Sequence, residues 1–188
     1  ISLHCHHLVV ATGGKSIPKM GATGLAFDIA DQFGIPCVET RPALVPLTFS
    51  DQRFKPITGL SASARVSTET AYFDEALLFT HRGLSGPAIL QISSYWREGQ
   101  SLTIDLLPDR ALSAELSAAR ARNGRRQLST VLAQFLPARL VSHLASELSI
   151  TGKLADQSDQ KIAALEHALK NWQVIPSGSE GYRTAEVT

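Results

Sequence analysis

Through the middle of the chain, from about 43 to 110, apolar residues recur at every second position, which is the period of a strand with one buried face. The clearest example is 60–66, where small or apolar residues alternate with Ser61, Ser63 and Arg65. A short helix is expected to begin at Pro87, because proline suits the first helical position. The pattern predicts short strands over 44–49, 60–66, 76–80 and 102–106.

Between 111 and 172 the period changes to that of amphipathic helices, with apolar residues three, four and seven positions apart. The first helix is expected to end at Asn123-Gly124, the third to begin at Pro137, and the fourth to be capped by Ser158. A strand-like pattern returns at 172–175 and 182–187. The helices are therefore expected to be nested within the β region. The four helical segments are about 113–122, 128–136, 137–148 and 162–172.

The first 42 residues predict a strand, a glycine turn and a helix. The apolar run 8–11 has the length of a buried strand and is followed by Thr12-Gly13-Gly14. A helix is expected over 25–33, stopped by Gly34. One such unit forms no sheet by itself, because parallel strands need neighbours.

Composition narrows the class of protein. The 188 residues are 44% apolar and 19% charged, with a formal net charge of +1, which is the balance of a soluble globular protein. No apolar run approaches the roughly 20 residues of a membrane-spanning helix, so we expect a cytoplasmic protein without a membrane or DNA partner. Cys5 and Cys37 are expected to be reduced thiols. Because the chain begins at Ile1 and stops at Thr188 without a cap, we expect both ends to continue into a longer protein.

Two short segments carry candidate chemistry. Thr12, Gly13 and Gly14 are typical either of a turn that lets a nucleotide approach the backbone or of an ordinary tight turn; no complete Gly-x-Gly-x-x-Gly motif occurs. Within 80–87, the donors of His81, Arg82 and Ser85 suit an anionic or carbonyl-bearing ligand. The alternative for this second segment is a capped turn with a solvated arginine.

A basic cluster follows the first predicted helix of the helical stretch. It is either a solvated surface or a phosphate-contacting patch, and no aromatic residue is interleaved with it in the sequence. Cys5 and the histidines around it, His4, His6 and His7, lack a second ligand cluster, so no metal site is expected. The basic cluster consists of Arg120, Arg122, Arg125 and Arg126.

Four blocks of the sequence, 10–24, 41–47, 78–90 and 181–188, resemble in order the HI0933-like flavoproteins, the bacterial YhiN/BaiN-type NAD(P)/FAD-dependent oxidoreductases. The resemblance implies an α+β fold in which a small β-barrel and a helical subdomain of three to four helices interrupt an FAD-binding domain. The expected domains are a partial FAD-domain flank over 1–42, a barrel over 43–110 completed by 173–188, and a helical subdomain over 111–172.

The resemblance also implies site residues. Thr12, Gly13 and Gly14 would contact the flavin nucleotide in the longer protein, which would use FAD and NAD(P)H. On position and chemistry, Arg82, Ser85, Tyr182 and Arg183 are assigned to the substrate side, with His81 as the candidate catalytic proton donor or polariser. Without the main pyrophosphate cradle, the chain alone is expected to be inactive and to hold no FAD.

Two hypotheses of function remain open. In the first, the parent protein is a flavin-dependent oxidoreductase that acts on a small unsaturated or carbonyl substrate, and this chain contacts the remainder of its FAD-binding domain. In the second, the barrel and helices recognise structured RNA and present a base to the flavin. The second hypothesis is motivated by the arginine cluster and by the size of the insertion.

Overall fold

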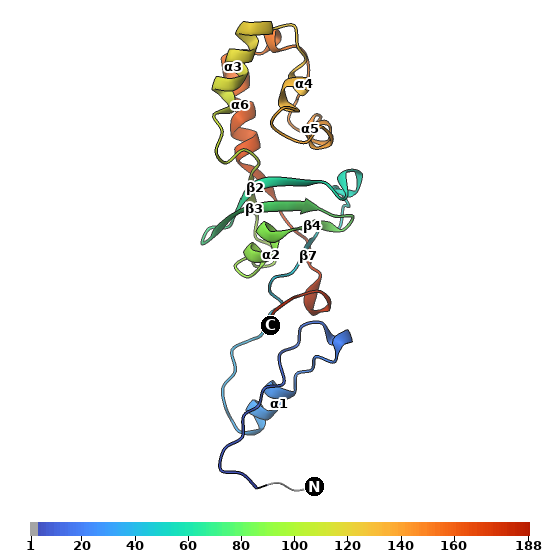
Figure 1. Ribbon diagram of the computed structural model, residues 1–188, viewed down its shortest axis with the longest axis vertical. Coiled ribbons are helices and arrows are strands. Elements are labelled where there is room, and N and C mark those ends of the chain that lie inside the picture. Colours follow the sequence, from blue (N-terminus) through green and yellow to red (C-terminus); the bar gives the residue numbers. More distant parts are fainter. Residues whose placement is uncertain (1–3) are drawn as a thin grey trace.

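The computed structural model describes residues 4–188 as an elongated molecule with three tiers. The helical tier lies at one end, an antiparallel sheet lies in the middle, and the N-terminal segment lies at the other end (Figure 1). The C-terminal end lies between the sheet and the N-terminal segment (Figure 1).

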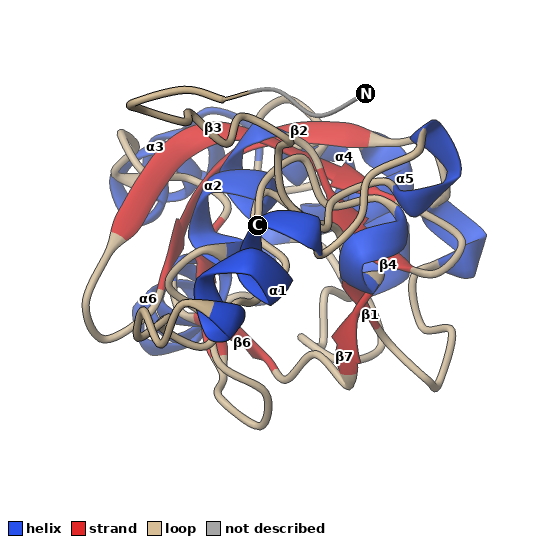
Figure 2. Cartoon of the chain, turned by 90° about the horizontal axis from the view of Figure 1, so that it is seen from below, coloured by secondary structure: helices blue, strands red, loops and turns tan. Residues whose placement is uncertain are grey.

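The middle tier is one seven-stranded sheet in the order β6-β5-β2-β3-β4-β1-β7, with every neighbouring pair antiparallel. Seen end-on, the strands curve around the centre of the molecule (Figure 2), but no ladder joins the described edge strands β6 and β7, so the barrel is not closed. The strands are β1 Leu47–Thr48, β2 Ser61–Ser67, β3 Tyr72–Phe79, β4 Gly83–Ser85, β5 Leu102–Asp105, β6 Trp172–Val174 and β7 Gly178–Ser179.

The alternation along β2 is confirmed, because Ala62, Ala64 and Val66 are buried while the serines between Leu60 and Ala64 face solvent. Helix α2, Pro87–Ser93, begins at the predicted proline and packs on β3. Aromatic rings fill the space where the sheet meets the helical tier, with the Phe54 ring centroid 5.3 Å from Phe79 and 5.9 Å from Trp172.

The nested helical subdomain is confirmed. The chain leaves the sheet after β5 and returns as β6, which pairs with β5. The predicted cap is formed, since the Ser158 hydroxyl accepts a hydrogen bond from the Lys161 backbone N–H at 3.2 Å. The helices of this tier are α3 Leu112–Asn123, α4 Leu128–Leu132, α5 Ala138–Leu144 and α6 Asp159–Lys170.

The N-terminal segment contains the predicted helix, α1 Leu25–Gln32, but the strand predicted over 8–11 is not formed. Leu8 and Val9 are 78% and 85% exposed, and no other described segment pairs with them. The prediction of a buried strand is therefore wrong for this run, because a strand needs a hydrogen-bonded neighbour. None of the residues 4–40 is buried.

Two further predictions are corrected by the structure. The strand expected over 182–187 is replaced by a 3₁₀ turn, η4 Gly181–Arg183, and an isolated β-bridge joins Val187 to Ala43. No strand was expected within 80–87, but this segment contains β4, which is too short and glycine-rich to show a period of two. Gly181 has φ +66°, a left-handed conformation that turns the chain out of the sheet.

Candidate functional site

The first candidate segment, Thr12–Gly14, lies where the N-terminal segment contacts the C-terminal residue of the chain. The backbone N–H groups of Lys15 and Ser16 donate to Thr188 Oγ1 at 2.8 and 3.2 Å. A Cβ on Gly14 would lie 2.5 Å from the same oxygen, so any larger residue would displace the Thr188 side chain. Gly13 has φ +73° and nothing within 4 Å of a Cβ placed there, which leaves its backbone open to a ligand. Thr12 is exposed beside it.

A cavity of about 530 Å³ borders the same junction. It lies between the chain entering the sheet and the end of α2, and Thr188 forms part of its wall. Arg41, Trp96 and Arg97 also line it.

In the second candidate segment, 80–87, the two glycines allow the backbone to lie close to neighbouring strands. A Cβ on Gly83 would lie 2.2 Å from the carbonyl oxygen of Leu47 in β1, and one on Gly86 would lie 2.7 Å from that of Ala76 in β3. Ser85 lies within β4, opposite Leu78. The two glycines of this segment therefore have a structural role.

His81 and Arg82 remain exposed in the turn between β3 and β4. Arg82 Nη1 lies 3.5 Å from Glu180 Oε1, and Arg183 Nη2 lies 3.6 Å from Glu180 Oε2. The two predicted substrate-side arginines are thus brought together by one carboxylate. Sequence reasoning missed Glu180, since it lies almost a hundred positions from Arg82 and only the pairing of β1 with both β4 and β7 makes them neighbours.

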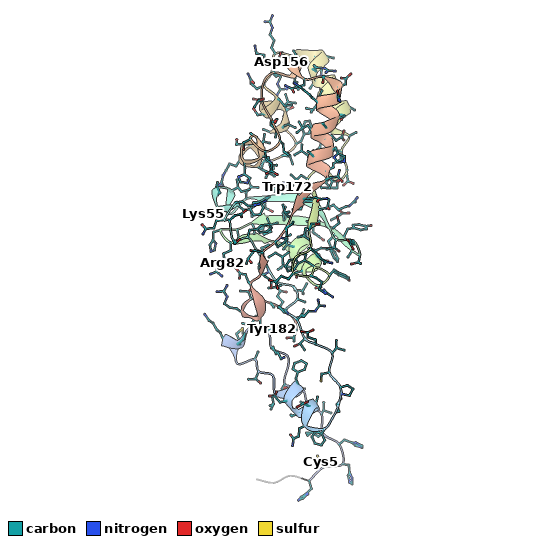
Figure 3. The ribbon with its side chains drawn as sticks, turned by 180° about the vertical axis from the view of Figure 1, so that it is seen from behind. Cys5, Lys55, Arg82, Asp156, Trp172 and Tyr182 are labelled. Atoms are coloured by element: carbon teal, nitrogen blue, oxygen red, sulfur yellow. The ribbon has the colours of Figure 1, made fainter. Side chains whose placement is uncertain are left out.

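Tyr182 turns inward instead of facing solvent. Its hydroxyl is buried without a hydrogen-bond partner among the described residues, as is Thr184 Oγ1. Its backbone carbonyl accepts a hydrogen bond from the Ile17 N–H at 2.8 Å. Tyr182 thereby joins the sheet tier to the N-terminal segment, and Figure 3 shows it between the two, with Arg82 on the sheet tier above it.

The arginine cluster divides into two parts. Arg120 binds the backbone carbonyl of Gln157 and the carboxylate of Asp159, which ties α3 to the beginning of α6. Arg122 and Arg126 line a groove of about 660 Å³, and their side chains have no hydrogen bond or ion pair within the described residues. Arg125 is exposed next to this groove but does not line it.

Folding places an aromatic side chain beside these arginines, although none is interleaved with them in the sequence. Phe135 lines the groove with Arg122 and Arg126, and the Arg110 guanidinium lies 5.2 Å from the centroid of its ring. Phe135 also lines a second hollow that extends to Ser61 and Ser63 on β2. We call these two hollows, which share Phe135, the α3–β2 groove.

Neither a metal centre nor a membrane span emerges from the described residues 4–188. No three His, Cys, Asp or Glu side chains in this range converge on one point. No helix in the same range has the length and apolar character that crossing a bilayer requires.

Comparison with known proteins places these features in context. The family described as "HI0933-like protein barrel and H2TH domain" matches residues 41–187. A protein of Haemophilus influenzae named ribosomal RNA dihydrouridine synthase is 42% identical over 189 residues, which cover 98% of this chain and 47% of that protein. A protein of Escherichia coli with the same name is 43% identical over 197 residues, covering 100% of this chain and 48% of that protein. The chain thus spans about half the length of these curated relatives.

Proposed function

The chain belongs to the HI0933-like family, and from this membership we propose that it is the RNA-binding part of a flavin-dependent enzyme that reduces uridine in ribosomal RNA. The observation that carries the proposal is the identity of 42% and 43%, over nearly the whole chain, to two proteins named ribosomal RNA dihydrouridine synthase. A ribosomal RNA substrate also accounts for the cytoplasmic location that we propose.

The chemistry of the product defines what the parent enzyme needs. Conversion of uridine to dihydrouridine adds a hydride and a proton across the carbon–carbon double bond of uracil. FAD, reduced by NAD(P)H, supplies the hydride when it is bound. The protein must hold the base, exclude water and deliver the proton.

The residues of this chain fit a partial FAD site. The open backbone of Gly13, with exposed Thr12 beside it and Gly14 behind it, suits contact with one edge of a nucleotide. The absence of a Gly-x-Gly-x-x-Gly motif from these 188 residues means that the pyrophosphate cradle must come from elsewhere in the parent enzyme. We therefore expect this chain alone to bind no FAD and to be inactive.

His81 is our candidate for the proton donor. It is exposed in the β3–β4 turn, next to Arg82, and an imidazole side chain can act as a general acid. In the full-length enzyme, His81→Ala should abolish most turnover while the flavin content stays unchanged. Full activity of this variant would remove His81 from the mechanism.

The α3–β2 groove is our candidate for the RNA grip. Arg122 and Arg126 offer unpaired positive charge for phosphates, and Phe135 with Arg110 offers a surface against which an unpaired base can stack. The polar side chains of Asn123 and Gln134 on the same surface supply hydrogen-bonding groups. This combination is what a single-stranded or looped RNA requires.

The test uses the full-length protein with ribosomal RNA that lacks the modification. With FAD and NAD(P)H, dihydrouridine should form in the RNA, as measured by mass spectrometry of its nucleosides. Turnover of a small enone substrate with no dihydrouridine formed would overturn the proposal in favour of a small-molecule oxidoreductase.

The groove is tested separately by salt-dependent RNA retention. The Arg122→Gln, Arg126→Gln double variant should bind RNA about tenfold more weakly and lower the slope of log affinity against log salt by about two. Arg65→Gln is the matched control, because Arg65 is a half-exposed sheet residue already paired with Asp74. Equal losses in both variants would show a general charge effect instead of a groove.

A further inference from the structure

We propose that Arg82 and Arg183, held together by Glu180, form a clamp for one phosphate group of the RNA substrate at the sheet–flank junction. This inference rests on the proposed function and deepens it, because it adds a second RNA contact remote in sequence from the α3–β2 groove. We call these three residues the Arg–Glu–Arg clamp.

The backbone beneath the clamp is fixed on both sides of strand β1. The Arg82 carbonyl accepts a hydrogen bond from the Phe49 N–H at 2.8 Å, just beyond one end of β1. The Glu180 N–H donates to the Pro46 carbonyl at 3.0 Å, just beyond the other end. Because β1 pairs with β4 and with β7, the residues that flank these two strands cannot move apart without breaking the sheet.

Burial orients the clamp toward solvent. The Glu180 side chain is only 15% exposed, whereas those of Arg82 and Arg183 are 46% and 49% exposed. The carboxylate therefore lies beneath two guanidinium groups that face outward. Each guanidinium carries five N–H donors in a rigid fork, and its approach to the carboxylate is 3.5 Å for Arg82 and 3.6 Å for Arg183.

The charge of the clamp matches a phosphodiester. Two arginines and one glutamate leave a net charge of +1, and the glutamate reduces the repulsion that would otherwise drive the two guanidinium groups apart. A phosphate group offers oxygens that arginine forks bind in pairs, with geometry that lysine does not reproduce. A phosphate placed over Glu180 would complete the hydrogen bonding of both arginines.

The position of the clamp suggests which phosphate it binds. Arg183 follows Tyr182, whose carbonyl holds Ile17, and Ile17 lies shortly after the proposed flavin-contacting residues Thr12–Gly14. Figure 3 shows Arg82, together with Tyr182, on the side of the sheet away from the helical tier. The clamp is therefore placed to hold the RNA near the nucleotide that is reduced, while the α3–β2 groove holds a more distant part.

The experiment measures RNA binding and turnover of the full-length enzyme carrying Arg82→Gln, Arg183→Gln or both changes. Each single change should weaken RNA binding about fivefold and lower the salt slope by about one, and the double change should lower the slope by about two. The KM for NAD(P)H and the flavin content should stay at the wild-type values. Arg65→Gln, which also removes one ion-paired sheet arginine, should leave RNA binding unchanged.

The outcomes separate this inference from the proposed function. If the wild-type enzyme forms no dihydrouridine in ribosomal RNA, the proposed function fails. If the wild type forms it and the clamp variants bind RNA as the wild type does, the clamp inference alone fails. A rise in the KM for NAD(P)H with unchanged RNA binding would also overturn it, because the bound phosphate would then belong to the dinucleotide.

Discussion

At the scale of single residues, the hydroxyl group of Tyr182 is buried without a hydrogen-bond partner among residues 4–188. Such a group loses its hydration on folding and regains nothing, at a cost of about 1–3 kcal/mol. Tyr182→Phe should therefore leave the free energy of unfolding unchanged or raise it, as measured by urea denaturation. Tyr72→Phe, at a position that is 63% exposed, is the control and should have no effect. A loss above about 1 kcal/mol in Tyr182→Phe would mean that the hydroxyl has a partner, such as an enclosed water.

At Gly86, just after β4, a single added carbon atom is expected to change the stability of the fold. Gly86→Ala would place a Cβ against the backbone of β3 in addition to straining a residue with φ +87°, so it should cost about 3 kcal/mol or more. Gly59→Ala is a matched control, because Gly59 has φ +81° but open space around it, and it should cost only about 1 kcal/mol. Equal losses in thermal denaturation would mean that backbone strain, not the close approach of strands, explains Gly86.

At the scale of elements, helix α3 depends on a cap from another helix. Its own N-cap residue, Ala111, has no capping side chain, but the Glu166 carboxylate on α6 accepts hydrogen bonds from the N–H groups of Leu112 at 2.9 Å and Ser113 at 3.0 Å. Burial alone would raise the pKa of Glu166, but these hydrogen bonds, that of the Ser113 hydroxyl and the nearby Lys170 charge together lower it.

The lowered pKa fixes the direction of the pH dependence. Because the carboxylate is favoured in the folded state, its contribution is fully present above the unfolded pKa of about 4.3 and is lost as pH falls through the lower folded pKa. Glu166→Gln should cost about 2 kcal/mol at pH 7 and should flatten the loss of stability below pH 4, as followed by urea denaturation at several pH values. Glu115→Gln, in an exposed pair with Arg110, should change stability by no more than about 0.5 kcal/mol.

The elements differ in how far the sequence predicts them. The helices of 112–170 were predicted because their signals are local: apolar spacing, Pro137 and the cap at Ser158 lie within each segment. The prediction of a strand over 8–11 was wrong because a strand forms hydrogen bonds with another strand, which the segment's own sequence does not reveal. Strand β4 was missed because its packing against β1 depends on glycines and not on alternating apolar residues. The helical period can be read from one segment, whereas a strand requires knowledge of its neighbour.

At the scale of the whole molecule, the candidate site likewise combines features that the local sequence predicts with features that depend on the fold. Its exposed arginines were found from the sequence, because charge and position mark them. Their partners were not, since Glu180 meets Arg82 only through the sheet order and Phe135 meets Arg122 only through the packing of the helical tier. The sequence therefore predicts which residues carry charge, and the fold decides which of those charges are paired, as for Arg120, and which remain available.

The distribution of buried residues predicts how the molecule unfolds. Every buried side chain of the described residues lies at Val45 or beyond. The N-terminal segment is joined to the C-terminal end by the backbone N–H groups of Lys15, Ser16 and Ile17, which donate hydrogen bonds to Thr188 and Tyr182. Segments without buried apolar contacts open with little free energy. In hydrogen exchange of the chain 1–188, the backbone amides of 4–40 should exchange much faster than those of β2 and β3.

The truncated chain 41–188 should then keep a thermal midpoint within about 3 °C of that of the longer chain, since a larger shift corresponds to about 1 kcal/mol or more. Equal protection of both regions, or a much lower midpoint after truncation, would show that the N-terminal segment contributes to the core.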